Sequence, residues 1–107
     1  MQTSNFARSS KDPRAVAISQ GIPRWYKGRR YIALAPPWEL VKIEDEKLFR
    51  ELYHTHVLAK LEPRTVFNEL GEDAILLCWE APGKFCHRRV VAEWLEKALN
   101  VKIDEKL

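Results

Sequence analysis

The sequence predicts one small α/β domain over residues 1–107, with a mainly parallel sheet of three or four strands flanked by helices. The length of 107 residues and the 46% share of hydrophobic residues suit a single core. Residues 74–79 read AILLCW, a short continuous apolar run of the kind found in strands buried on both faces. Strand-like and helix-like patterns also alternate along the chain, which is typical of α/β folds.

In the first third of the chain, we expect a strand over residues 2–7 and a short helix over residues 13–20. Asp12 is placed to be the N-cap of that helix, Pro13 its first residue and Gly21 its left-handed C-cap. Residues 22–38 contain three prolines and one glycine, which together exclude a long helix. A structured loop of this length is typical of a lid or a binding surface.

The rest of the chain has three helical patterns. Residues 44–61 carry apolar side chains at steps of three and four, which predicts an amphipathic helix. A shorter helix should run from Pro63 to residue 70 and stop at Gly71. After the strand over residues 74–79 we expect a turn at residues 81–83, a helix over residues 86–99 and a last strand over residues 101–103.

The charge is unevenly distributed, and no segment suggests a membrane. Residues 1–42 hold eight basic and two acidic side chains, whereas residues 43–107 hold ten basic and thirteen acidic ones, so the first part should face an anionic partner. No apolar run approaches the roughly 20 residues that cross a bilayer, and the N-terminus lacks the apolar region of a secretory signal. We therefore expect a cytoplasmic protein. In such a compartment, Cys78 and Cys86 are expected to be free thiols, ligands or catalytic groups rather than a disulfide.

The residue types most able to take part in catalysis or ligand binding lie where the buried strand ends and the next helix begins. Cys78 and Glu80 close the strand, and Cys86, His87 and Arg88 open the helix. Ligands of parallel α/β sheets bind beyond the carboxyl ends of the strands, where helix N–H groups attract anions. The helix start and the neighbouring cations should favour the thiolate of Cys86, so this thiol should react before Cys78.

This segment resembles the C-terminal motif of the domain-of-unknown-function 488 family. The motif consists of an apolar strand ending in Cys-x-Glu, a short turn containing proline, Cys-His-Arg and a helix, and here it reads LLCWE, CHR and VAEWL. The close similarity covers about a quarter of the chain. The resemblance implies an α/β fold and family residues at Cys78, Glu80, Cys86, His87 and Arg88, but no settled activity.

From these residues we expect an enzyme, or an enzyme-like binder, of a small anionic ligand, either phosphorylated or of the nucleoside and nucleotide type. Cys86 would be the reactive thiol or anion contact, His87 the proton carrier and Glu80 the orienting group or base. Arg88 would clamp the anion, with Cys78 among the binding residues. Structural alternatives stay open, because Cys78 can be a small core residue and Arg88 can form a structural clamp with Glu80.

No metal or other cofactor is expected. Cys78, Cys86 and His87 are candidate ligands, but their spacing is not that of a zinc knuckle. In addition, two adjacent residues on a helix, such as Cys86 and His87, point in different directions. A thiolate site without metal is therefore the expectation.

A second group of residues, 24–31, interleaves four basic side chains with three aromatic ones. Arg24 and Trp25 are assigned to substrate binding, with the whole segment closing over the cysteines. The same composition suits single-stranded nucleic acid, so a non-catalytic nucleic-acid-binding module is the alternative function. The aromatic side chains could equally pack onto the sheet. A homodimer through the apolar faces of the helix over residues 44–61 is a further possibility.

Overall fold

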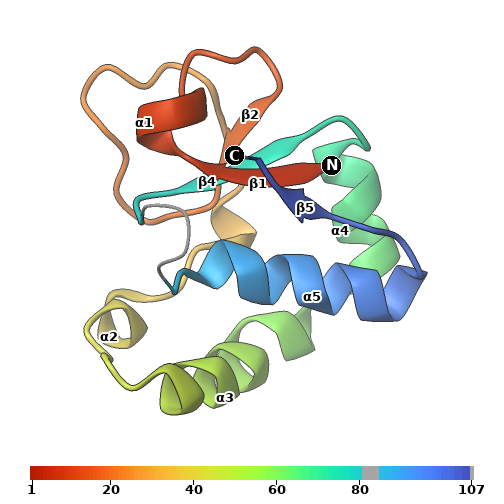
Figure 1. Cartoon of the computed structure of the whole chain (residues 1–107). Helices are drawn as coiled ribbons and strands as arrows, with labels where there is room; N and C mark the ends of the chain where they lie inside the picture. The colour runs from red at the N-terminus through yellow and green to blue at the C-terminus, as the bar shows by residue number, and fades with distance from the viewer. Residues whose placement is uncertain (81–84, 107) are drawn as a thin grey trace.

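The sheet at the centre of the computed structural model has the strand order β3-β2-β4-β1-β5, and every pair is parallel (Figure 1). The structure describes residues 1–80 and 85–106, and within them the sheet has five strands. The strands are β1 (Gln2–Asn5), β2 (Ala15–Ala17), β3 (Arg29–Arg30), β4 (Ile75–Cys78) and β5 (Asp104–Glu105). The predicted α/β class is confirmed. The strand count exceeds three or four because each edge strand has only two residues, too few to leave a pattern.

Strand β4 is the middle of the sheet, as its apolar run predicts. All four of its residues are buried. Ile75 is aligned with Gln2 of β1 on one side and with Ala15 of β2 on the other. Both of its edges and both of its faces are therefore covered, which explains why nearly every residue of this segment is apolar.

Two hydrophobic clusters cover the two faces of the sheet. Val16 and Leu76 face a large cluster that includes residues of α3 (Glu46–His56), α4 (Pro63–Leu70) and α5 (His87–Leu99). Ala17 and Leu77 face a smaller cluster on the side of α1 (Phe6–Ser9). Figure 1 shows α5 directly under the sheet with α3 beyond it, and α1 on the opposite face.

The predicted helices of the second half are confirmed, with ends shifted by a few residues. Helix α3 begins after Asp45, whose side chain accepts a hydrogen bond from the Leu48 N–H at 2.9 Å, and a 3₁₀ helix over Leu58–Lys60 follows it. Helix α4 has Pro63 at its start, and Gly71 ends it with a φ of +92°. The apolar side of α3, which the sequence offers to a dimer partner, packs inside the chain through Phe49 and Tyr53.

The segment over residues 22–38 is largely a loop, as predicted, but it contains short elements. These are β3, a 3₁₀ helix (Ile32–Leu34) and the first residue of α2 (Trp38–Val41).

The helix predicted over residues 13–20 is wrong, because this segment forms strand β2. Its three residues are all buried between β3 and β4, which leaves no exposed side for a surface helix. Asp12 does not cap a helix; its carboxylate accepts hydrogen bonds from the backbone and side chain of Arg14 and so holds a turn before the strand.

The last strand is displaced from its expected position over residues 101–103. The pairing residues are Asp104 and Glu105, which lie beside Gln2 and Thr3 of β1. The turn predicted at residues 81–83 lies outside the described residues. In the described part of the chain, no helix has the length and apolar character needed to cross a bilayer.

Replacing Gly71 by alanine should destabilise the fold by about 1–3 kcal/mol, because a φ of +92° with a ψ of +142° is strained for any residue with a Cβ atom. Gly21→Ala is the matched control, since φ there is not positive and the nearest side-chain atom is 3.7 Å from the added Cβ. Urea unfolding of both variants checks this expectation. An equal loss of stability in the two variants would contradict it.

Candidate functional site

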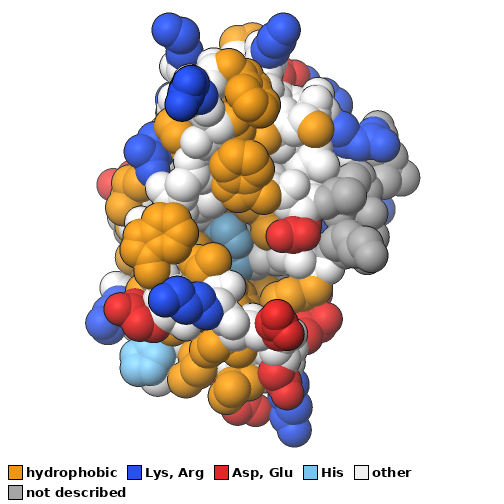
Figure 2. Space-filling model, turned by 90° about the vertical axis from the view of Figure 1, so that its left-hand side faces the viewer, with side chains coloured by type: hydrophobic (Ala, Val, Ile, Leu, Met, Phe, Trp, Pro, Cys, Tyr) orange, Lys and Arg blue, Asp and Glu red, His pale blue; other side chains and the backbone are white. Residues whose placement is uncertain are grey.

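A cavity of about 590 Å³ opens beyond the carboxyl ends of β2 and β4, where parallel α/β sheets bind ligands. Residues after β2, after β4 and at the start of α5 form its inner wall, and residues from the region of α2 and α3 form the outer wall. The described lining residues are Ser19, Gln20, Gly21, Pro36, Trp38, Val41, Ile43, Glu44, Phe49, Cys78, Trp79, Glu80, Phe85, Cys86 and His87. Figure 2 shows this face of the molecule, with a hollow rimmed by hydrophobic side chains and with both basic and acidic side chains along its lower edge.

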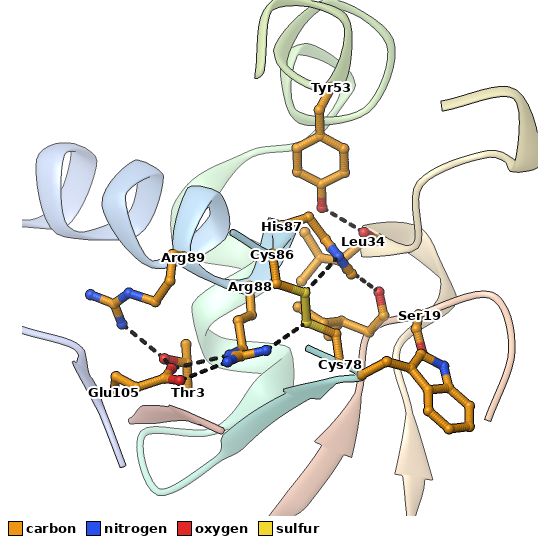
Figure 3. Close-up of a disulfide and its surroundings, with 12 residues drawn as sticks. Thr3, Ser19, Leu34, Tyr53, Cys78, Cys86, His87, Arg88, Arg89 and Glu105 are labelled. Atoms are coloured by element: carbon orange, nitrogen blue, oxygen red, sulfur yellow. Dashed lines mark hydrogen bonds and ion pairs between the residues drawn. A yellow bond between two sulfur atoms is a disulfide. The ribbon is translucent and has the colours of Figure 1, made fainter. Parts of the chain in front are cut away.

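The two cysteines meet at the floor of the cavity and form a disulfide (Figure 3). The expectation of free thiols is therefore wrong for this state of the protein. Cys78 is the last residue of β4 and is 1% exposed, whereas Cys86 is the N-cap of α5 and is 7% exposed. Cys86 has an extended backbone, with φ −150° and ψ 149°, so it precedes the helix rather than forming part of it. The order of reactivity expected for the two thiols stays a prediction for the reduced protein.

His87 is the first residue of α5, and its imidazole is buried beside the cysteines. Its Nε2 lies 2.6 Å from the backbone oxygen of Ile18. A carbonyl can only accept, so Nε2 carries the proton and Nδ1 has a free lone pair. This Nδ1 is 3.7 Å from Cys86 Sγ. Burial lowers the pKa of His87 to about 4, so the imidazole is neutral near pH 7.

Arg88 is fully buried and forms an ion pair with Glu105. Its Nη2 and Nε donate to the two carboxylate oxygens at 2.7 and 3.1 Å, and Nη1 donates to Cys78 Sγ at 3.1 Å. The structural alternative for Arg88 is thus the one observed, with Glu105 as the carboxylate partner in place of Glu80. Glu80 lies exposed on the wall of the cavity. Arg88 points toward β5 and is not among the described lining residues, and its expected role as the clamp of a bound anion stays a prediction.

A second cation of α5, Arg89, strengthens the same connection. Its Nη1 donates to Thr3 Oγ1 at 2.8 Å and to the backbone oxygen of Ile103 at 3.1 Å, while the Thr3 hydroxyl donates to the Glu105 carboxylate. Helix α5 is therefore connected to both β1 and β5 next to the cysteine pair.

Residues 24–31 do not close over the cysteines in this structure, and the substrate-binding roles expected for Arg24 and Trp25 stay predictions. Tyr26 packs with Phe6 on the opposite face of the sheet, at 5.4 Å between ring centroids. Arg24 and Trp25 are exposed and are not among the described residues that line the cavity. Arg29 donates to the backbone oxygens of residues 69 and 70, and Arg30 to that of residue 20. Two of the four cations in this segment therefore hold the fold together.

Sequence reasoning missed the aromatic walls of the cavity and the partner of Arg88. Trp38 and Trp79 are 57% and 52% exposed although both line the cavity. Trp79 directly follows Cys78 at the end of a buried strand, and that position could have identified it. Glu105 carried no local signal, because its role depends on β5 pairing with β1 far away in the sequence.

The fold and the site define a small parallel α/β domain with an aromatic-walled cavity that ends on two cysteines and a histidine. Comparison with family models, with curated proteins and with solved structures finds no match for this chain. The resemblance to the domain-of-unknown-function 488 family accordingly stays a prediction based on its short motif.

Replacing Glu105 by glutamine should destabilise the protein by about 3 kcal/mol, because it removes the carboxylate charge that Glu105 pairs with the buried guanidinium of Arg88. Asp104→Asn is the matched control, since this neighbouring carboxylate is exposed and lies 3.9 Å from Lys102; it should change the stability by less than about 0.5 kcal/mol. The free energy of unfolding in urea measures both effects. A Glu105→Gln variant as stable as its control would show that the buried ion pair is not needed.

The stabilising effect of Glu105 should depend on pH. Burial by itself would raise the pKa of this carboxyl, but the hydrogen bonds from Arg88 and Thr3 outweigh it and hold the pKa below its usual range. A carboxyl with a lowered pKa in the folded state stabilises the fold above its unfolded pKa and loses that effect as the pH falls through the folded value. The stability difference between wild type and Glu105→Gln should therefore be constant above about pH 5 and shrink toward pH 3. Parallel stability curves over this range would contradict the assignment.

Proposed function

We propose that the protein is an enzyme-like binder of a small ring-bearing molecule of the nucleoside type, held in the cavity with Cys86 and His87 at its reactive end. The observation that supports this proposal is that the cavity ends on these two residues. Its volume of about 590 Å³ lies in the range of small-molecule sites, which is roughly 300–1,000 Å³.

The walls of the cavity favour a flat ring. Trp38 and Trp79 present exposed indole surfaces to it, and Phe85 lies close to the cysteines. Indole faces stack on heteroaromatic rings, and such stacking contributes about 1–3 kcal/mol per base in nucleic-acid complexes. The indole N–H of Trp79 donates to the backbone oxygen of Gly21 at 3.0 Å, which fixes this side chain at the rim.

The charges of the described lining residues favour a ligand without a phosphate. Glu44 and Glu80 line it, whereas the guanidinium of Arg88 is paired with Glu105. Carboxylates accept hydrogen bonds from hydroxyl and amino groups and repel phosphates. Of the two ligand types expected from the sequence, the uncharged nucleoside type therefore has more support than the phosphorylated type.

The alternative of a nucleic-acid-binding module has less support. Arg29 and Arg30 donate to backbone oxygens, and no residue of the segment 24–31 is among the described lining residues. Arg24, Lys27 and the exposed Trp25 stay available to such a partner.

Binding of adenosine, guanosine, cytidine and uridine, each compared with its 5′-monophosphate, tests the proposal. At least one nucleoside should quench the tryptophan fluorescence in a saturable way and bind more tightly than its monophosphate. Trp38→Leu should weaken this binding by about tenfold, because it removes a stacking surface. Trp25→Leu is the matched control, since this indole is just as exposed, at 59% against 57%, and is not among the described lining residues.

Three results would count against the proposal. Absence of saturable binding by all four nucleosides would refute it, and equal losses in the Trp38 and Trp25 variants would place the ligand elsewhere. Tighter binding of the monophosphates would refute the argument from charge. Binding of single-stranded DNA that weakens with salt and depends on Trp25 would instead support the nucleic-acid alternative.

A further inference from the structure

Three side chains with metal-binding atoms converge at the floor of the cavity. The sulfurs of Cys78 and Cys86 and a ring nitrogen of His87 all lie within 4.8 Å of one another, and all three residues are buried. They come from the end of β4 and the start of α5, two elements fixed by the core. Figure 3 shows the imidazole directed at the two sulfurs.

The sequence argument against joint ligation by Cys86 and His87 does not hold in the structure. That argument requires both residues to be helical. Cys86 is the extended N-cap of α5, so its sulfur turns toward Cys78 and toward the imidazole of the following residue. Cys86 and His87 can therefore bind the same metal ion although they are adjacent in the sequence.

The orientation of His87 is the one that metal-binding histidines adopt. Its Nε2–H donates to the backbone oxygen of Ile18, which leaves the lone pair of Nδ1 facing the sulfurs. Histidine ligands of metals almost always donate their second ring N–H to a carbonyl or carboxylate in this manner, which fixes both the ring and its tautomer.

The charges of the surroundings also suit a divalent cation. Two thiolates and a neutral imidazole carry a charge of −2, which a divalent ion would balance inside a buried site. Arg88 donates to Cys78 Sγ at 3.1 Å, and Glu105 balances its charge. Hydrogen bonds of this kind stabilise thiolate ligands, and the arginine adds no net charge to the site.

The backbone separation of the two cysteines leaves room for a metal between the sulfurs. The Cα atoms are 7.1 Å apart, so the side chains of the reduced cysteines can turn their sulfurs apart without a large shift of the backbone. A zinc ion bonded to each sulfur at about 2.3 Å bridges cysteines that lie farther apart than a direct bond requires.

We propose that the reduced protein binds one Zn²⁺ through Cys78 Sγ, Cys86 Sγ and His87 Nδ1, with the fourth position open to the cavity. Three protein ligands with an open fourth position are the arrangement of catalytic rather than structural zinc. Two thiolates and an imidazole suit Zn²⁺, whereas oxygen-seeking ions such as Mg²⁺ need carboxylates and water. The metal site goes beyond nucleoside binding and can be tested without any nucleoside.

The disulfide and the zinc site are alternative states of the same two sulfurs. A phosphine reductant and one water convert the disulfide into two thiols, and the phosphine is oxidised to its oxide. Zn²⁺ then replaces the two thiol protons, which are released to the solvent. The oxidised protein has no thiolate to offer and should not hold the metal.

The test is to reduce the full chain with a phosphine, remove the reductant without oxygen and titrate Zn²⁺ against a chromogenic chelator. One Zn²⁺ per chain is expected for the reduced protein and none for the oxidised protein. Titration with Co²⁺ in place of Zn²⁺ should give the near-ultraviolet thiolate-to-metal band together with the intense visible bands of tetrahedral cobalt. Bound Zn²⁺ should also protect both cysteines from alkylation.

The histidines provide the matched variants. The chain has three of them, and His54 and His56 lie exposed on α3. His87→Gln should weaken Zn²⁺ binding by about 100-fold or more, because even outer partners of a metal site change affinity by 10- to 100-fold. The double variant His54→Gln with His56→Gln should bind as wild type does.

Several outcomes would overturn the zinc site. They are a reduced wild-type protein that binds no Zn²⁺, equal binding by reduced and oxidised protein, or loss of binding in the His54 and His56 variant. The comparison of reduced with oxidised wild type decides the matter even if His87→Gln does not fold, which circular dichroism would reveal. Zinc binding without nucleoside binding would refute only the proposed function, and the reverse result would refute only the zinc site.

Discussion

The arrangement around the cysteine pair depends on the ion pair between the buried guanidinium of Arg88 and Glu105. A charge without solvent requires compensation, and among the described residues Glu105 on the last short strand supplies a carboxylate. The guanidinium also donates to the sulfur of Cys78. One side chain therefore connects the start of α5, the end of β4 and the edge strand β5. This connection fixes the start of α5, where Cys86 and His87 stand, against the central strand.

The parts of the fold that could be predicted are those in which local pattern and tertiary environment agree. Strand β4 is surrounded on all sides and is apolar throughout, and α4 begins at Pro63 and ends at Gly71, as their backbone preferences require. Strand β2 was missed because Pro13 and Gly21 resemble helix punctuation, while its burial depends on distant partners in β3 and β4. Three-residue strands carry too little periodicity to overrule such local signals.

For the candidate site, the position could be predicted from the sequence, but the roles of its residues could not. Its place at the end of β4 and the start of α5 follows from a general property of parallel sheets and could be predicted. The roles of its members could not, because they depend on contacts that join separate parts of the chain. The pairing of Arg88 with Glu105 depends on β5, and the orientation of His87 depends on the carbonyl of Ile18 after β2.

The backbone at Cys86 decides what the cysteine pair can do. If this residue were helical, its sulfur would diverge from the His87 ring, and a disulfide or a lone thiol would be the available states. Because it is an extended N-cap, both sulfurs and Nδ1 face one point at the floor of a cavity that Trp38 and Trp79 also line. The reduced pair can then share a cation that the oxidised pair cannot. The oxidation state of two buried sulfurs would in this way determine the chemistry that a ligand meets at the end of the cavity.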